Sequence, residues 1–193
     1  MTASYLPASS PLPLGIAIAP PPGWLEMLRI FPAEAPSPAE EIALTEARLF
    51  DLVVMHDTLR RGWRFAFDLT PDHWNPAAWG FLSATGTGDC EDWALAARQL
   101  AVRRGLARGA LRIACCLLPW LPPGANGHAV LTVWTDRGVF CLDLGRAGVW
   151  PWAELPYTWQ AVEEPGSKLW RAITPPVNLA DLAPPRPLVA PAA

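Results

Sequence analysis

The sequence predicts an α+β fold, because its helical segments come first and its strand-like segments follow. Residues 90–104 are rich in Ala and Leu, begin with acidic residues and end with Arg103-Arg104, as the helix dipole favours. Three strand candidates follow this helix, at 111–118, 128–136 and 139–144. Asp136-Arg137-Gly138 is suited to a short hairpin turn between the last two strands.

An earlier helix is predicted from Ser37 to about Arg61, before Gly62. Ser37-Pro38-Ala39-Glu40 has Ser as N-cap, Pro at the first helical position and Glu at the capping-box position. The apolar stripe of this helix has a period near 3.6 and contains His56, which we interpret as a hydrogen-bonded core histidine. Residues 64–89 are expected to be irregular, and a fourth strand is expected at 169–173.

The distribution of proline predicts the domain organisation. The chain has 193 residues, enough for one domain with appendages, and its 23 prolines concentrate at both ends. We therefore predict a Pro-rich N-terminal arm at 1–36, one domain at 37–174 and a Pro-rich tail at 175–193. Apolar side chains are expected to anchor the arm to the domain: Trp24, Leu25, Leu28 and Ile30.

Composition excludes several classes of protein. A hydrophobic fraction of 51% with 17% charged residues is the opposite of a disordered chain. A net charge of −3 argues against nucleic acid as the main partner, and no apolar run reaches the roughly 18 residues of a membrane span. The N-terminus lacks the basic region of a signal peptide, so a cytoplasmic location is expected. The cysteine spacing matches neither a disulfide framework nor a zinc site.

The string Gly86-Thr-Gly-Asp-Cys-Glu-Asp92 carries the chemistry. It places Cys90 in the first turn of a helix, where backbone N–H groups and the dipole stabilise a thiolate and can receive an oxyanion. His128 and Asp143 fall on two strands that are expected to pair, which can hold an imidazole beside a carboxylate. The three residues can therefore form a Cys-His-Asp triad.

Each of these residues also has a structural interpretation. Cys90 can be a buried structural cysteine, His128 a strand-end histidine and Asp143 a turn residue. His73 is a rival base. The acids around Cys90 can serve only as first-turn acids, and the remaining cysteines are expected to be inert core residues: Cys115, Cys116 and Cys141.

The motifs Asp72-His-Trp74, Gly86–Ala94, His128–Leu131 and Leu142-Asp143 together resemble the bacterial transglutaminase-like cysteine proteinases, relatives of the periplasmic proteases that cleave biofilm adhesins. The resemblance covers about residues 68–160. It implies a transglutaminase/papain-like core, with a nucleophile helix packed on an antiparallel sheet. It also implies Cys90 as nucleophile, His128 as base and Asp143 as the residue that orients the base.

These observations predict a cysteine-dependent hydrolase, an endopeptidase that acts on a protein or peptide through a thioester acyl-enzyme and needs no cofactor for the chemistry. Trp74 and Trp79 are expected to line the substrate cleft, and either indole can supply a second oxyanion donor. Two alternatives remain open: an acyl transferase or transamidase with the same triad, and a non-catalytic binding module that docks through its Pro-rich ends.

Calcium is the candidate metal. Asp89, Glu91 and Asp92 should raise the pKa of the Cys90 thiol by like-charge repulsion, so a cation nearby would favour the thiolate. Ca²⁺ prefers such hard oxygen ligands. In the adhesin-cleaving relatives the two acids that flank the cysteine bind calcium, which implies Asp89 and Glu91 here. Alternatively, these acids hold an arginine or only cap the helix.

Overall fold

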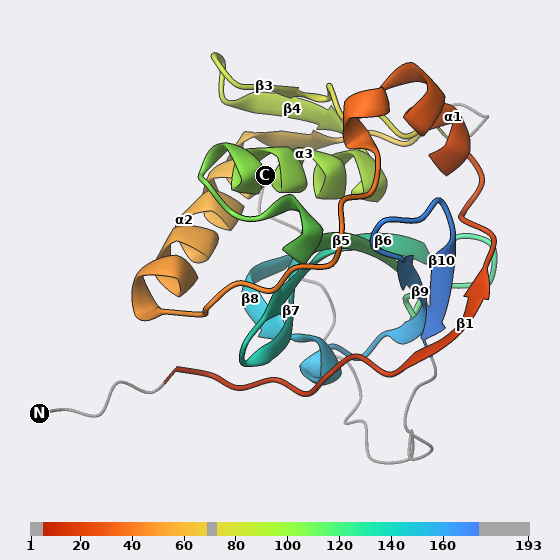
Figure 1. The fold of residues 1–193 in the computed structure, drawn as a ribbon. Helices are drawn as coiled ribbons and strands as arrows, with labels where there is room; N and C mark the ends of the chain where they lie inside the picture. Colours follow the sequence, from red (N-terminus) through yellow and green to blue (C-terminus); the bar gives the residue numbers. More distant parts are fainter. Residues whose placement is uncertain (1–5, 69–72, 174–193) are drawn as a thin grey trace, which may run out of the picture.

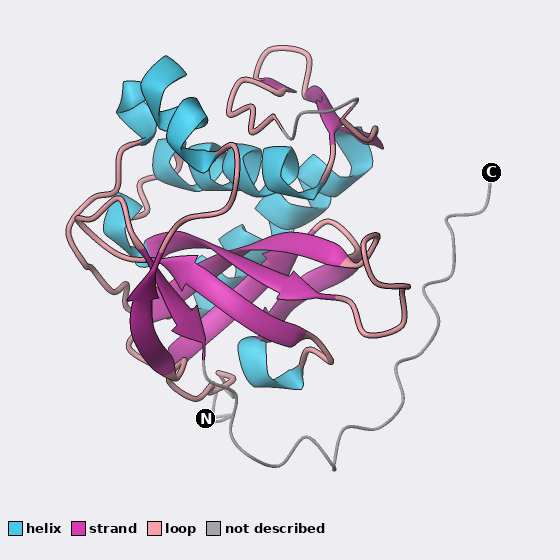
Figure 2. Ribbon diagram, turned by 90° about the vertical axis from the view of Figure 1, so that its right-hand side faces the viewer, coloured by secondary structure: helices cyan, strands magenta, loops and turns pink. Residues whose placement is uncertain are grey.

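The computed structural model describes residues 6–68 and 73–173. A seven-stranded antiparallel sheet forms one layer, and the helix that begins at Cys90 lies between this sheet and a small three-stranded sheet (Figure 1). Figure 2 shows the strands of the large sheet gathered below the main helices. The predicted α+β class is therefore confirmed.

The described residues form three α-helices: α1 (Trp24–Ile30), α2 (Glu46–Gly62) and α3 (Cys90–Arg103). The large sheet has seven strands in the spatial order β1 (Leu14–Ile18), β10 (Trp170–Ile173), β9 (Thr158–Glu163), β5 (Leu111–Leu117), β6 (Gly127–Thr135), β7 (Gly138–Asp143) and β8 (Arg146–Pro151). The small sheet has the order β2 (Trp63–Phe65), β4 (Thr85–Gly88) and β3 (Trp79–Gly80). Single 3-10 turns complete these elements: η1 (Pro32–Glu34), η2 (Arg108–Ala110) and η3 (Trp152–Glu154).

The N-terminal segment is part of the folded sheet. β1 pairs with β10, and Ser9 bonds the β6–β7 hairpin through N–H···O of Arg137 at 2.8 Å and Oγ–H···O of Val139 at 2.6 Å. Of the expected anchors on α1, Trp24 and Leu28 are buried, whereas Leu25 and Ile30 are exposed. A deletion of residues 1–36 would remove an edge strand and a buried tryptophan. The tail at 175–193 lies outside the described residues, and docking through either end stays a prediction.

The predicted start of the second helix at Ser37 is wrong. Helix α2 begins at Glu46, with Thr45 as N-cap, whose side chain accepts a hydrogen bond from Arg48 N at 3.2 Å. The chain before it is extended because Ile42 exchanges backbone hydrogen bonds with the end of the β6–β7 hairpin, at 3.0 Å to Trp134 and from Asp136. These long-range bonds outweigh the local capping signal at 37–40.

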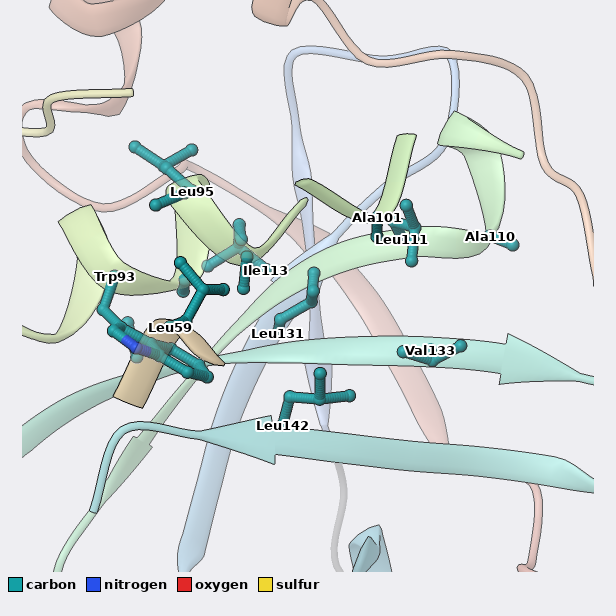
Figure 3. Packing of buried hydrophobic residues seen from close by; sticks show 14 of the residues in the cluster. Leu59, Trp93, Leu95, Ala101, Ala110, Leu111, Ile113, Leu131, Val133 and Leu142 are labelled. Carbon is teal, nitrogen blue, oxygen red and sulfur yellow. The ribbon is translucent and has the colours of Figure 1, made fainter. Parts of the chain in front are cut away.

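Two hydrophobic clusters lie on the large sheet. The larger one joins α1, α2 and α3 to one face of the strands; Figure 3 shows Trp93 of α3 beside Leu59 of α2, with Leu131 and Leu142 of the strands in the same cluster. The other cluster includes Leu12 from the N-terminal segment together with Cys116, Cys141, Trp152 and Tyr157. The sheet is thus buried on both sides, which fixes the strands that carry His128 and Asp143.

A buried ion-pair network ties the N-terminal segment to the core. Arg98 of α3 is 0% exposed and donates to both oxygens of Glu163, at 3.0 and 2.8 Å, and to Glu34 at 2.5 Å. Glu163 also accepts the backbone N–H of Ile113 at 2.5 Å. Among residues 6–68 and 73–173, no helix has the length and hydropathy needed to cross a membrane.

Candidate active site

Cys90 is the first residue of α3, with Asp89 as the N-cap, and its side chain is half-buried. Gly88, two residues before Cys90, has a backbone conformation that favours glycine. Its φ is 152°, and a methyl group added there would lie 2.7 and 2.9 Å from Cβ and Cγ of Asp92, and closer still to its Oδ2. Asp92 in turn accepts the backbone N–H of Asn75 at 2.6 Å. Position 88 of the Gly-Asp-Cys-Glu-Asp motif therefore requires glycine, because a side chain there would overlap Asp92.

His128 and Asp143 are in direct contact, as their places on paired strands predict. The imidazole Nε2 lies 3.0 Å from Oδ1 of Asp143, which is 1% exposed. Oδ1 also accepts the N–H of Gly145 at 2.7 Å, and Oδ2 accepts the hydroxyl of Tyr157. Burial alone would raise the pKa of the Asp143 carboxyl, but His128, Tyr157 and Gly145 together hold that pKa below its ordinary value.

This contact also selects the tautomer of His128. Because Asp143 is a carboxylate, the proton on the imidazole lies on Nε2, which donates to it. Nδ1 is then the nitrogen that can accept a proton. Asp143 is a turn residue as well as the histidine's partner, since its bond to Gly145 N–H closes the tight turn between β7 and β8.

The sulfur of Cys90 lies against the start of β6. It accepts a backbone hydrogen bond from Ala129, the residue after His128, while the thiol donates to Oε2 of Glu91 at 3.1 Å. Burial, followed by the charges of Glu91 and Asp89, raises the pKa of this thiol well above its ordinary value. The expected repulsion by the neighbouring acids is therefore present and, together with burial, sets the direction of the shift; the expected contribution of the helix start to lowering the thiol pKa stays a prediction.

His56 supports the same site from α2. It is fully buried, its Nε2 donates to the backbone carbonyl of Asp143 at 2.8 Å, and its ring contacts Trp93 edge-on at 5.4 Å. The interpretation of His56 as a hydrogen-bonded core histidine is confirmed. Burial lowers its pKa. The rival base His73 is exposed, and its backbone N–H donates to Asp68.

Three carboxylates beside Cys90 could hold a metal ion. Single oxygens of Asp68, Asp89 and Glu91 all lie within 4.8 Å of one another. β2 runs parallel to β4 with Phe65 opposite Gly88, so the chain after β2 arrives beside the start of α3 and brings Asp68 to the two predicted acids. Asp89 and Glu91 are only 9% and 6% exposed. Like charges so close and so poorly hydrated are suited to a hard cation.

The remaining candidates lie in the core. Trp74 packs edge-on against Trp24 at 5.3 Å, Trp79 stacks on Trp63 at 6.3 Å, and their side chains are 4% and 5% exposed. Their predicted role in substrate binding stays a prediction. Cys116 and Cys141 are buried in the second cluster, and Cys115 is half-buried on β5.

Sequence reasoning missed two residues at the site. Asp68 has no motif of its own, because only the parallel pairing of β2 with β4 brings it to the acids. Tyr157 is one of two tyrosines in the chain and stands in a Pro-Tyr-Thr-Trp stretch just before β9. That stretch carries no signal that it would reach Asp143.

Comparisons with known proteins identify the fold and the family of the chain. In Legionella pneumophila, calcium-bound LapG is 20% identical with a TM-score of 0.54, covering 67% of this chain and 71% of that chain. EGTA-treated LapG from the same organism is 20% identical to this chain with a TM-score of 0.53, and the match covers 68% of this chain and 70% of that chain. These similarities establish a shared fold, the predicted transglutaminase/papain-like core. None of the curated proteins matches the chain. A family model described as bacterial transglutaminase-like cysteine proteinase (BTLCP) matches residues 19–177, and the chain therefore belongs to that family of cysteine peptidases.

Proposed function

We propose that this protein is a cysteine endopeptidase in which Cys90 is the nucleophile, His128 the general base and Asp143 the residue that orients the base. The observation that carries the proposal is the 3.0 Å contact between His128 and buried Asp143, next to the strand position whose N–H binds the Cys90 sulfur. Membership of a cysteine proteinase family supports a protein substrate.

The proposed reaction begins from a neutral thiol, since burial and the adjacent acids raise the pKa of Cys90. His128 Nδ1 takes the thiol proton as the sulfur attacks the scissile amide carbon. The resulting oxyanion lies by the N–H groups in the first turn of α3. His128 then gives its proton to the leaving amine, which leaves a thioester on Cys90. Water attacks the thioester while His128 accepts a proton from it, and the acid product departs from the restored thiol.

Covalent labelling tests the triad without knowledge of the natural substrate. A peptidyl vinyl sulfone should label the wild-type protein at Cys90, as located by peptide mass spectrometry, and Cys90→Ala should abolish the label. His128→Ala should slow labelling by about a hundredfold or more, because general-base catalysis contributes roughly 10²–10⁴-fold. Cys115→Ala is the matched control, a second half-buried cysteine, and should label like the wild type.

The outcomes separate the proposal from its alternatives. Labelling that persists in Cys90→Ala would contradict the choice of nucleophile. If no labelling occurs in the folded wild type, the chain is a binding module. If an acyl-enzyme forms but an added primary amine is incorporated in preference to hydrolysis, the protein is an acyl transferase.

We also propose that Asp68, Asp89 and Glu91 hold Ca²⁺. The proximity of their oxygens supports this proposal, as does the similarity of the fold to calcium-bound LapG. A bound cation would offset the charge of the two buried acids beside the thiol. Backbone carbonyls and water would complete a coordination number of six or more.

Thermal melting tests the metal proposal. With excess Ca²⁺ the melting temperature should rise, as linkage requires, and EGTA should remove the increase. The double variant Asp89→Asn, Glu91→Gln should lose the response to Ca²⁺. Asp51→Asn removes an exposed acid on α2 and should retain the response. If neither EGTA nor the double variant alters the response, the acids are not calcium ligands. Mg²⁺ should act weakly, because it demands a tighter octahedral site.

A further inference from the structure

Tyr157 is a buried residue whose hydroxyl is directed at the carboxylate of Asp143. The tyrosine is 4% exposed and the aspartate 1% exposed. The Tyr157 ring packs edge-on against the His128 ring with centroids 5.9 Å apart, and it contacts Trp120 and Trp159 at 5.8 Å each. The phenol therefore touches both partners of the His-Asp pair.

The contacts of Asp143 divide between its two oxygens. Oδ1 accepts from His128 and from the N–H of Gly145, and Oδ2 accepts from Tyr157. Rotation of the carboxylate about its Cβ–Cγ bond would break bonds at both oxygens at once. Without the Tyr157 hydroxyl, Gly145 and His128 would hold only one end of the group.

The Tyr157 hydroxyl can hold the Asp143 carboxylate because it remains a hydrogen-bond donor. Burial and the charge of Asp143 raise the pKa of its phenol far above the ordinary value. The hydroxyl therefore keeps its proton throughout the range in which a peptidase works. A buried hydroxyl beside a carboxylate with an open lone pair forms a charge-assisted hydrogen bond.

We propose that Tyr157 is a positioning residue that locks the Asp143 carboxylate and, through it, the His128 ring in the orientation that serves Cys90. The proposal rests on the proposed function, since it assigns His128 as the base. Tyr157 does not touch the reacting atoms: it acts on the base through Asp143.

The hydroxyl should also change the pH response of the base. By sharing the charge of Asp143, it reduces the attraction that this carboxylate exerts on a protonated His128. Removal of the Tyr157 hydroxyl should therefore move the acidic limb of the pH–rate profile to higher pH. Other titratable or charged groups surround His128, Asp143 and Tyr157 and stay the same in the two proteins to be compared: His56, Cys116 and Cys141 at Asp143, Arg146 at Tyr157, Arg60 at the neighbouring Leu144 carbonyl, and Cys90 at the N–H of Ala129 next to His128.

The test is Tyr157→Phe, which removes the hydroxyl and keeps the ring. Inactivation by the peptidyl vinyl sulfone is followed at Cys90 from pH 4 to pH 9, and the maximal rate and the probe concentration for half-maximal rate are measured separately. We expect the maximal rate to fall about ten- to a hundredfold, the equivalent of one hydrogen bond to a charged group, with the half-saturating concentration unchanged. The midpoint of the acidic limb should rise by about half a pH unit or more.

Trp159→Phe is the matched control, because it reduces the packing on the Tyr157 ring and leaves the hydroxyl in place. It should lower the melting temperature without moving the acidic limb. A maximal rate within about twofold of wild type in Tyr157→Phe, or a loss of rate with no shift of the limb, overturns the positioning role. A His128→Ala protein that labels as fast as wild type overturns the proposed function instead, so the two failures are distinguishable.

Discussion

Gly88→Ala should destabilise the protein strongly, because both the backbone conformation and the space for a side chain are restricted at this position. The φ of 152° is one that residues with a Cβ rarely adopt. The added methyl group would also overlap the side chain of Asp92, which is 4% exposed and holds the N–H of Asn75 at 2.6 Å. The alanine must therefore displace a buried carboxylate.

The expected loss follows from these two effects. An unfavourable backbone conformation costs about 1–3 kcal/mol. Displacing Asp92 costs a further ~1.5–3 kcal/mol, the usual value of a hydrogen bond to a charged group. We expect the free energy of unfolding to fall by about 3–5 kcal/mol, and labelling of Cys90 to slow, because Gly88 sets the entry to α3.

Two glycines provide controls for the separate effects. Gly124 has a φ of 87° and nothing within 4 Å of an added methyl group, so Gly124→Ala should cost only about 1 kcal/mol. Gly127 has no positive φ and the same open space, so Gly127→Ala should be within roughly 0.5 kcal/mol of wild type. Urea unfolding measures all three. A Gly88→Ala protein within about 1 kcal/mol of Gly124→Ala would refute the overlap with Asp92.

Three further predictions use the same unfolding assay. Arg98→Ala should cost about 3–5 kcal/mol, because it leaves buried Glu34 and Glu163 with only the more distant Arg108, at 3.9 and 4.0 Å, as counter-charge, whereas Arg171→Ala, at a half-exposed pair, should cost less than ~1 kcal/mol. Thr45→Ala should cost about 1 kcal/mol and Ser37→Ala less than ~0.5 kcal/mol, since the helix begins after Thr45; equal losses would contradict that start. Burial lowers the pKa of His56 in the folded protein, so the unfolded chain binds the proton more tightly and stability should fall as pH drops below about 6.5, by at most ~1.4 kcal/mol per pH unit. His56→Gln keeps a donor for the Asp143 carbonyl and should lose that dependence, and an unchanged dependence would assign it to another group.

Local signals predicted the elements that they control. The Ala/Leu-rich run after Asp89 became α3, and the Asp136-Arg137-Gly138 turn joins β6 to β7 as expected. The contact between His128 and Asp143 followed from that pairing alone. Each of these features depends on residues close together in the sequence or on two adjacent strands.

The parts that escaped prediction depend on distant contacts. β1 exists because residues at the other end of the chain supply β10 as its partner. The helix signal at Ser37 failed because the β6–β7 hairpin binds the backbone of Ile42. Asp68 and Tyr157 reach the site only through the pairing of β2 with β4 and the position of the chain before β9. No local pattern encodes such contacts.

The environment of Cys90 explains why this site depends on its supporting residues. Burial and the charges of Glu91 and Asp89 raise the pKa of the Cys90 thiol, which donates a hydrogen bond to Glu91, so the thiol resists ionisation. The thiolate must therefore be produced during the reaction, by transfer of its proton to His128 or by a cation that offsets Asp89 and Glu91. In the proposed mechanism the first route requires an imidazole held in one orientation with Nδ1 free to accept a proton, and the bonds of Asp143 to His128 and Tyr157 would serve that purpose. The second route requires a cation held at Asp89 and Glu91, the acids that the family resemblance implies as calcium ligands. If Asp68, Asp89 and Glu91 hold Ca²⁺ as proposed, Asp89 and Glu91 would suppress ionisation of Cys90 without the cation and permit it with the cation, so the labelling rate of Cys90 should depend on Ca²⁺ concentration more steeply than the melting temperature does.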